Sequence, residues 1–385
     1  MFAALVLVSL LGPLSIHLFV PVLPFVRQSF GVDAETAQLS FSLSMLCMAA
    51  TTPLYGTFAD RYGRLPVLLL GIGLFTCGAA AAGFAQSIEA LIIGRMIQGA
   101  GAGCGLVLAR AIARDVYGAE RLGKMISYLT AAMVLGPMFG PPLGGWLTDM
   151  FGWAYNLAVP ASFGVLTIII IVFVIGETKP KDLLPPANVI TGYYLLLRNP
   201  RFVCFALNPA INSGVFFALN SSAVYLMVET LGTSAVDFGL WFMLGPVGYM
   251  AANCLAGRLS NRFSSEQQVI FGSAFSLCGS LALPGLVGIM GITPESLFIT
   301  SLIISFGQGF SNPHAQAIAI AVDETLAGTA SGIVVFFYLL VVAGLTQLVS
   351  LAMPGSVTLL VGTMMIAGSV AFLLGLLGVK IYKRT

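Results

Sequence analysis

The feature that most limits what this chain can fold into is a succession of apolar segments, each about 20 residues long and separated by short polar connections. A helix of that length crosses a hydrocarbon layer about 30 Å thick. We predict twelve such spans, at residues 3–26, 38–59, 66–86, 89–113, 122–147, 153–176, 202–228, 237–259, 267–290, 296–321, 327–351 and 355–379. The sequence therefore predicts an all-α integral membrane protein, with the lipid bilayer as its surroundings and no room for a soluble catalytic domain.

Charged residues are scarce and unevenly placed. Only 8% of the residues are Asp, Glu, Lys or Arg, against about 25% in a typical soluble domain. With the amino terminus inside, nearly all basic residues fall in the inner connections and the tail, whereas the outer connections hold only Arg27. Basic residues collect on the cytoplasmic side of membrane proteins. We therefore predict a multi-pass protein of the inner (cytoplasmic) membrane with both termini in the cytoplasm.

The longest inner connection is rich in proline and charge, which is typical of a linker. We predict an N-terminal six-helix bundle at residues 1–176, a cytoplasmic linker at 177–201 and a C-terminal six-helix bundle at 202–385. Two short patterns recur in both halves. Residues 56–62 (Gly-Thr-Phe-Ala-Asp-Arg-Tyr) are echoed by 257–263 (Gly-Arg-Leu-Ser-Asn-Arg-Phe), and Gln98-Gly99 by Gln308-Gly309. The echoes favour a duplicated, pseudo-symmetric architecture.

The connection after the second span combines glycines with charged side chains: Gly56, Asp60, Arg61, Gly63 and Arg64. Glycines permit close approach and tight turns, and a carboxylate beside two guanidinium groups can form charge-assisted hydrogen bonds. We interpret these residues as a conformational latch at the inner face. Anchoring by the positive-inside rule alone would explain the two arginines, but neither the acid nor the glycines.

Two ionisable residues lie within predicted spans. Arg95, followed by Gln98 and closely spaced small residues, lies a few residues inside the outer surface. Such a cation either faces a bundle interior or water, or its side chain extends to the nearby surface. His17 lies near the end of the first span, and histidine can carry a proton near neutral pH. We assign His17, Arg95 and Gln98 to a coupling site or cavity; His17 as a proton carrier and His17 as a simple hydrogen-bond donor both remain open.

Small residues and prolines alternate in the fifth span: Gly136, Pro137, Gly140, Pro141, Pro142, Gly144 and Gly145. The prolines each remove a helical donor and should bend the axis. The glycines should allow a neighbouring helix to approach closely.

The second half carries polar and aromatic residues within its predicted spans. We predict that a substrate cavity is lined by Asn208, Asn212, Phe216, Trp241, Gln308, Asn312 and His314. The alternative for the aromatic residues is that they face lipid or the protein core. The chain shows no phosphate-binding loop, nucleophile elbow or metal-ligand spacing, so we expect no catalytic residues, no metal and no cofactor.

Together these motifs resemble the major facilitator superfamily, its twelve-span drug:proton antiporter group, and most of all the bicyclomycin/chloramphenicol-resistance branch. Residues 56–64 match the signature Gly-x-Leu-Ala-Asp-Arg-x-Gly-Arg except at Phe58, and residues 95–101 resemble Arg-x-x-Gln-Gly-x-Gly. Residues 110–115 resemble the branch's Arg-Ala-x-x-Arg-Asp run. Residues 136–145 resemble Gly-Pro-x-x-Gly-Pro-x-x-Gly-Gly, a pattern that marks exporters. The branch usually carries Asp-x-Tyr at the end of the first span, where this chain has His17 and Phe19.

The resemblance implies a secondary active transporter that exports small lipophilic compounds by alternating access, in exchange for protons, and works as a monomer. The substrate site would lie between the two bundles near the membrane midplane. An exporter of a native metabolite or siderophore is the alternative within the same class. An integral membrane enzyme would need a cluster of polar catalytic groups, which the sequence does not show. Nothing in the composition, with a net charge of +2, indicates a nucleic-acid partner.

Overall fold

The computed structural model describes residues 1–179, 189–323, 326–353 and 356–382. The prolines and charges of the expected linker between residues 180 and 188 lie outside this part. Every regular element of the described residues is a helix. The expected all-α class is therefore confirmed.

The chain divides into two compact units. Unit 1 is Met1–Ala187 together with Ala235–Gly239, and unit 2 is Asn188–Ser234 together with Leu240–Thr385. The helices of unit 1 are α1 (Phe2–His17), η1 (Val20–Val22), α2 (Leu23–Phe30), α3 (Ala34–Tyr62), α4 (Arg64–Gly83), α5 (Ile88–Met133), α6 (Leu135–Phe151) and α7 (Tyr155–Val174). The helices of unit 2 are α8 (Val189–Arg198), α9 (Pro200–Tyr225), η2 (Leu226–Thr230), α11 (Leu244–Leu259), α12 (Ser265–Met290), α13 (Pro294–Ile320), α14 (Ala327–Ser350) and α15 (Thr358–Tyr382).

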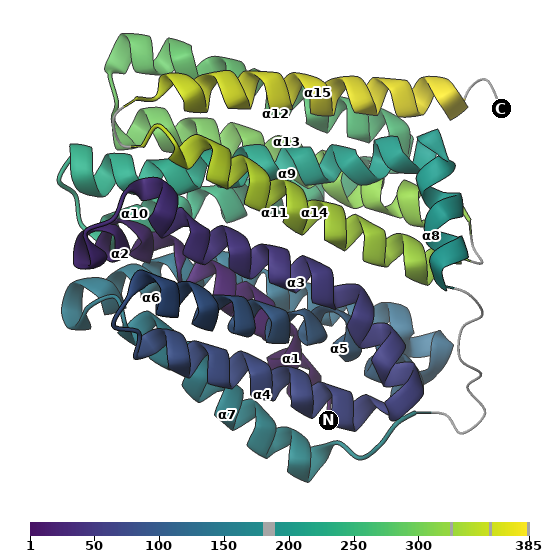
Figure 1. Ribbon diagram of the computed structural model, residues 1–385. Helices are drawn as coiled ribbons and strands as arrows, with labels where there is room; N and C mark the ends of the chain where they lie inside the picture. The colour runs from purple at the N-terminus through teal and green to yellow at the C-terminus, as the bar shows by residue number, and fades with distance from the viewer. Residues whose placement is uncertain (180–188, 324–325, 354–355, 383–385) are drawn as a thin grey trace. The chain divides into compact units, whose positions relative to one another are not determined.

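One short helix, α10 (Ala235–Phe242), begins in unit 1 and ends in unit 2. Sequence alone did not lead us to expect that five residues from the second half would group with the first. Within each unit the long helices lie side by side, and in unit 2 the short α8 runs across their ends (Figure 1).

Nine helical segments of the described residues are long and apolar enough to cross a membrane. They coincide with nine of the twelve expected spans. The other three expected spans correspond to α3, to α13 and to the end of α5 with α6. Of these, α3 has 29 residues and α13 has 27, so both are long enough to span but are richer in polar residues. The helices therefore account for all twelve predicted spans.

The course of α5 and α6 follows from their contacts with α1. Gly105 lies against Val8, the Tyr128 ring lies 5.9 Å from the Phe2 ring, and Gly140 of α6 lies against His17. After Gly105 the chain thus reaches the first residue of α1, at Phe2, and α6 then runs along α1 towards His17. Two predicted spans, the fourth and the fifth, are accommodated in this way.

Glycines bring helices together in both units. A Cβ at Gly99 of α5 would collide with the backbone of Ser44 in α3, and a Cβ at Gly309 of α13 would collide with the backbone of Tyr249 in α11. Close backbone approach through glycine is a common way of packing helices in membranes, where lipid gives no hydrophobic drive for association. The echoed Gln-Gly pairs therefore have the same packing role in the two units.

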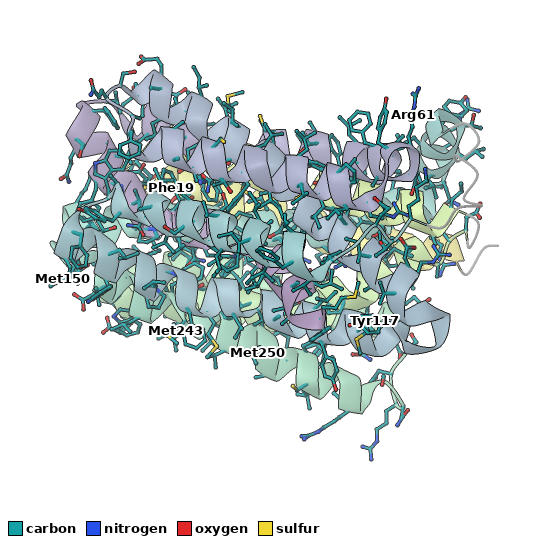
Figure 2. All side chains as sticks on the ribbon, turned by 90° about the horizontal axis from the view of Figure 1, so that it is seen from below. Phe19, Arg61, Tyr117, Met150, Met243 and Met250 are labelled. Atoms are coloured by element: carbon teal, nitrogen blue, oxygen red, sulfur yellow. The ribbon has the colours of Figure 1, made fainter. Side chains whose placement is uncertain are left out.

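Large apolar side chains are exposed on both units. Phe84 is 86% exposed, Phe173 83% and Ile289 84%. Apolar exposure on this scale is the surface that lipid covers. Buried and exposed side chains can be compared within unit 1 in Figure 2, where buried Phe19 lies among the packed helices and exposed Arg61 lies at the edge.

Candidate functional site

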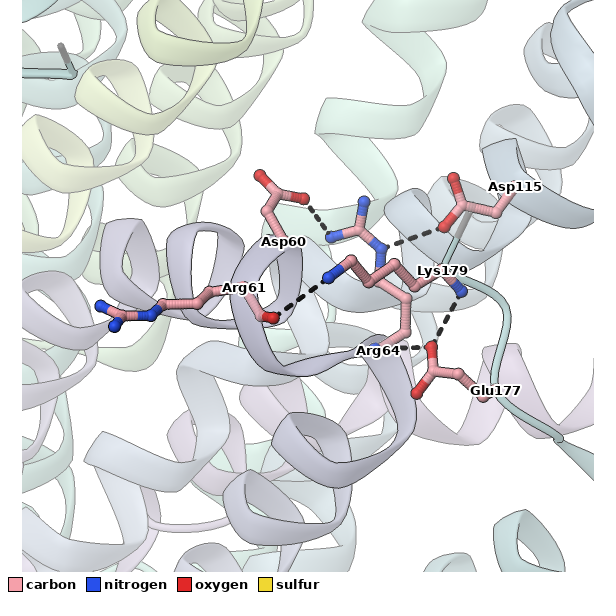
Figure 3. A network of polar contacts seen from close by, with 6 residues as sticks. All are labelled: Asp60, Arg61, Arg64, Asp115, Glu177 and Lys179. Atoms are coloured by element: carbon pink, nitrogen blue, oxygen red, sulfur yellow. Dashed lines mark hydrogen bonds and ion pairs between the residues drawn. The ribbon is translucent and has the colours of Figure 1, made fainter. Parts of the chain in front are cut away.

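A network of charged side chains joins α3, α4 and α5 at one end of unit 1 (Figure 3). Arg64, the first residue of α4, is only 7% exposed. Its Nη1 bonds Oδ1 of Asp60 at 2.6 Å, and its Nε bonds Oδ2 of Asp115 at 3.0 Å. Charge-assisted hydrogen bonds of this kind are about twice as strong as neutral ones. One guanidinium thus holds the carboxylates of two other helices.

A third carboxylate closes the network from the segment that follows α7. Oε1 of Glu177 accepts a hydrogen bond from the backbone N–H of Arg64 at 2.9 Å, and Oε2 accepts one from Leu65 at 3.2 Å. The first backbone N–H groups of a helix lack intrahelical partners and carry a partial positive charge. Glu177 therefore caps α4 from 113 residues away in sequence.

The electrostatics of Glu177 follow from these bonds. Partial burial raises the pKa of its carboxyl, but hydrogen bonds donated by the backbone N–H groups of Lys179, Arg64, Leu65 and Thr178 outweigh it, so that the pKa lies below its usual 4.5. The ionised carboxylate is the form that fits this position.

Gly63 makes the network possible. It joins α3 directly to α4 with a φ of +106°, a backbone conformation that favours glycine. A Cβ at this position would also lie 2.5 Å from Oε2 of Glu177. Any other residue at position 63 would therefore disturb both the turn and the cap of α4.

The other two predicted latch residues behave differently. The side chain of Arg61 points away from the network (Figure 3) and lies 5.3 Å from the Tyr62 ring, while its carbonyl oxygen accepts a hydrogen bond from Nζ of Lys179 at 3.0 Å. A Cβ at Gly56 would meet only Val107, at an ordinary 3.6 Å. The close helix approach that we expected at Gly56 is therefore not present.

Three members of the network were not predicted as latch residues: in the sequence, Asp115 is only the last residue of a run that resembles the family's, and Glu177 and Lys179 are only charges of the expected linker. Their partners are 51, 113 and 118 residues distant in sequence, respectively.

The echo in unit 2 forms no such network among the described residues. Asn261 and Arg262 lie exposed in the turn between α11 and α12, and no ion pair to Arg262 is found among the described residues. An amide in place of the acid removes the charge that would hold an arginine.

A second polar group is buried deep in unit 1 around Arg95 of α5, which is 1% exposed. Its Nη1 and Nη2 donate to Oγ and to the carbonyl oxygen of Ser15, each at 3.1 Å, and Nη1 also donates to Oε1 of Gln98 at 2.6 Å. Its Cζ lies 4.1 Å from the centre of the Phe19 ring. Arg95 thus points into the unit, and the interpretation that it extends to the outer surface is wrong.

The direction of Arg95 has a physical cause in α1. That helix ends at His17, two residues after Ser15, and the chain continues as the short η1. Carbonyl groups at a helix end lack intrahelical donors, and a cation there complements the helix dipole. The guanidinium therefore donates a hydrogen bond to a carbonyl group at the end of α1 instead of extending to water at the membrane surface.

The glycines of α6 form the face that packs against α1. A Cβ at Gly140 would lie 2.7 Å from Cβ of His17, and a Cβ at Gly144 would lie 2.6 Å from the carbonyl oxygen of Leu18. Gly136, one turn earlier, lies against Pro13. Spaced four residues apart, these glycines share one face of the helix. They hold α6 directly against buried His17.

The prolines of the fifth span act less uniformly than we expected. The helical break falls at Val134, between α5 and α6, and Pro137 lies in the first turn of α6, where its missing N–H costs nothing. Pro141 and Pro142 lie inside α6, which continues as one helix to Phe151. Only Pro137 therefore marks an interruption.

The opposite face of α6 packs against the start of α10. A Cβ at Gly145 would collide with the backbone of Ala235. One turn later, Asp149 accepts hydrogen bonds from the backbone N–H groups of Ala235 at 3.3 Å and Val236 at 3.0 Å. The carboxylate thus caps α10 within unit 1.

Four of the predicted cavity residues in unit 2 lie in a buried polar cluster. Nδ2 of Asn208 donates to Oγ of Ser273 at 2.9 Å and to the carbonyl oxygen of Ala371 at 2.7 Å, and Ser311 donates to Oδ1 of Asn208 at 2.8 Å. Asn208 therefore ties α9 to α12, α13 and α15. The other three members bond nearby groups of α9 and α13, and they are Asn212, Gln308 and Asn312.

The remaining predicted cavity residues are not part of this cluster. Phe216 packs against Phe242, with ring centres 5.6 Å apart. Trp241 stacks on Phe298 at 6.0 Å, and Nδ1 of His314 bonds the Phe310 carbonyl of its own helix at 2.9 Å. The structure thus gives Phe216 and Trp241 aromatic packing partners, in line with the alternative that they belong to the core.

Gln38 of α3 is a buried polar residue that was not predicted from the sequence. Its side chain is 0% exposed, and neither its Oε1 nor its Nε2 has a hydrogen-bond partner among the described residues. Ser42, one turn further on the same face, and Nε2 of Gln98 are also buried without a partner. Unpaired buried polar atoms are costly and call for water or a ligand. A glutamine and a serine in an apolar span were the only sequence signal.

Comparison with known proteins places this architecture. The sequence pattern that defines the Major Facilitator Superfamily matches residues 5–346. Multidrug resistance protein D of Escherichia coli (strain K12) is 29% identical over 336 residues, which cover 86% of this chain and 83% of the relative. The Bicyclomycin resistance protein homolog of Haemophilus influenzae is 25% identical over 338 residues, covering 85% and 83%.

Solved structures share the fold at lower identity. The crystal structure of a D-xylose-proton symporter has a TM-score of 0.79 and 15% identity, covering 98% of this chain and 96% of the other. A POT family transporter in complex with 5-aminolevulinic acid has a TM-score of 0.76 and 14% identity, covering 98% and 94%.

Proposed function

Because the chain belongs to the Major Facilitator Superfamily and is therefore a multi-pass membrane transporter and not an enzyme, we propose that it exports small lipophilic compounds in exchange for protons. The names of its relatives, multidrug resistance protein D and a bicyclomycin resistance protein homolog, support this substrate class. We further propose that it works as a monomer in the inner membrane, by alternating access of two six-helix bundles, with both termini in the cytoplasm and no nucleic-acid partner.

One observation carries the proton coupling. His17 is 7% exposed at the end of α1, where α6 packs against it through Gly140 and where Arg95 bonds Ser15 two residues earlier. An ionisable side chain within a membrane span is a functional candidate by default. Here it lies close to the buried guanidinium of Arg95 and to the glycine-lined contact of α6 with α1. Any movement of α6 along α1 would change the surroundings of His17.

The inner-face network would contribute the conformational control. Arg64, Asp60, Asp115 and Glu177 join four segments of unit 1 in one arrangement. The guanidinium of Arg64 bonds the carboxylates of both Asp60 and Asp115. A shift of α4 would therefore break several charged contacts together. We propose that these contacts favour one transport state over the other.

Buried polar atoms of unit 1 would form hydrogen bonds with the substrate. Gln38 and Ser42 on α3 have polar atoms without partners among the described residues. A substrate with one polar group on an apolar body would satisfy them, since binding sites of this type are mostly apolar with a few placed polar groups.

Purified protein in proteoliposomes with an imposed pH gradient tests the proposal. A panel of lipophilic drugs, with a set of polar metabolites as the comparison, should show gradient-driven movement of several drugs, and the gradient should dissipate faster in their presence. Movement of metabolites alone would instead indicate the native-metabolite exporter. Movement that ignores the pH gradient would contradict proton coupling.

A further inference from the structure

The short helix α8 does not run alongside the long helices of unit 2 but crosses their ends (Figure 1). The turn after it is fixed by the sequence. Asn199 takes an extended conformation and its side chain accepts hydrogen bonds from Arg201 N at 3.0 Å and Phe202 N at 3.2 Å, with Pro200 at the first position of α9. A residue before proline is disfavoured in helical conformation. The chain therefore must end α8 here and start α9 in a new direction.

One face of α8 is fastened to unit 2. Leu196 is 2% exposed within a cluster that includes Phe202 and Phe205 of α9 and Ile333 of α14, and Tyr193 packs against the same cluster. Gly192 faces Leu326 and Thr329 at the start of α14. This contact makes α8 a fixed part of the unit's surface.

Three apolar or aromatic side chains in the second half of α8 are exposed. Tyr194 is 53% exposed, Leu195 55% and Leu197 47%. Arg198 is also exposed, and its guanidinium carbon lies 4.6 Å from the centre of the Tyr194 ring. No carboxylate bonds Arg198 in the part of the chain that the structure describes. A helix across the ends of spanning helices, with apolar flanks and a tyrosine–arginine pair, has the composition of an interfacial helix.

Two further observations indicate what covers it. The Leu196 cluster reaches through Phe205 to Gly378 of α15, and exposed Leu377 beside it belongs to the apolar surface that lipid covers. Among the residues that the structure describes, the segments at this end of unit 2 carry five basic and two acidic residues, namely Arg198, Arg201, Arg258, Arg262 and Lys380 against Glu266 and Asp323. Glu266 is itself bonded to Arg201 at 3.4 Å. The surface is continuous with lipid and is positively charged.

We propose that α8 binds the anionic phospholipid surface of the cytoplasmic leaflet, with Leu195 and Leu197 among the upper acyl chains and Arg198, steadied by Tyr194, on a headgroup phosphate. This assignment of the leaflet rests on the orientation given under the proposed function, but the binding does not depend on transport. The site would fix the depth of unit 2 in the membrane at its cytoplasmic end.

Native mass spectrometry of the purified full chain from micelles containing phosphatidylglycerol and phosphatidylcholine tests the headgroup contact. Arg198→Gln should lower the retention of phosphatidylglycerol relative to phosphatidylcholine about fivefold, the effect of one basic residue near an anionic surface. Arg262→Gln removes the same charge from an exposed arginine at the same end but outside α8; it is the matched control, and its effect should be clearly smaller than that of Arg198→Gln. Equal retention in wild type and Arg198→Gln would overturn the proposal, and so would displacement of the lipid by inorganic phosphate at equal concentration.

A second measurement locates α8 without relying on charge. A bimane label on Leu197→Cys, in a parent in which the exposed Cys77, Cys254 and Cys278 are serine, is read in nanodiscs against quenching by doxyl-labelled lipid and by aqueous iodide. Stronger quenching by the lipid is expected, and stronger quenching by iodide would overturn the proposal. Neither readout requires transport. Their failure can therefore be told apart from failure of the exporter proposal, which the proteoliposome assay measures.

Discussion

At the scale of single residues, the inner-face network depends on the shape of one guanidinium. Arg64 reaches Asp60 with Nη1 and Asp115 with Nε, so it bonds two carboxylates from different helices in fixed directions. A lysine would bring one ammonium group, which lacks this planar fork. The arginine is therefore needed for its geometry as well as for its charge.

Replacing Asp60 with asparagine tests the latch. Asp60→Asn should lower the transport rate about tenfold or more, because a hydrogen bond to a charged group contributes about 1.5–3 kcal/mol, while the protein remains folded in the membrane. The measurement is efflux from proteoliposomes alongside size-exclusion chromatography. Glu266→Gln is the control, since Glu266 forms a partly buried ion pair with Arg201 in unit 2. Wild-type efflux by Asp60→Asn would exclude a latch at this residue.

Glu177 gives the network a pH dependence with a definite sign. Its pKa in the folded protein lies below the usual 4.5, so its contact with α4 stabilises fully above about pH 4.5 and is lost as the pH falls through the lower folded-state pKa. We expect Glu177→Gln to lower the unfolding temperature at neutral pH, and the difference from wild type to shrink at about pH 3. Thermal unfolding in detergent at both pH values measures this. A difference that stays constant or grows on acidification would contradict the assignment.

At the scale of elements, the contact of α6 with α1 is set by glycine. Gly140→Leu should destabilise the protein by about 1–3 kcal/mol through overpacking and should slow export, because α6 can no longer lie against His17. Gly73→Leu in α4 is the matched control, since nothing lies within 4 Å of a Cβ there. Melting temperature and efflux are measured for both. Equal tolerance at the two positions would show that the α6 glycines have no packing role.

Prediction from sequence succeeded for the elements because span length and apolarity are local properties of the chain. All twelve spans were found in this way, including α3 and α13, whose polar residues lower their hydropathy. The break at Val134 was missed, because a proline in the sequence can either interrupt a helix or occupy the first turn of a new one. Glu177 was missed because its partners, Arg64 and Leu65, are more than a hundred residues distant in sequence. Arg95 was predicted as a candidate, but the direction of its side chain could not be predicted, because it depends on where α1 ends in the folded protein.

At the scale of the whole molecule, coupling to protons is the property to test at His17. We expect His17→Ala to transport down a substrate gradient without response to the pH gradient, whereas His17→Asp should retain coupling, since it keeps an ionisable side chain at this position. Proton release on substrate addition to solubilised protein, with gradient-driven uptake into inverted vesicles, measures both. Full coupling in His17→Ala would make His17 a bystander and direct attention to His314, the chain's other histidine.

The docking of α10 on α6 has a consequence for biosynthesis. Asp149 and Gly145 find their partners in Ala235 and Val236, which belong to the same compact unit but follow α9 in the chain. Unit 1 therefore cannot be completed when translation reaches Ala187; its last piece arrives only after a helix of unit 2 has been made. A fragment that stops at Ala187 should insert with this face of α6 uncovered, and should be degraded faster than the same fragment produced together with residues 188–385. Pulse–chase labelling in cells compares the two half-lives.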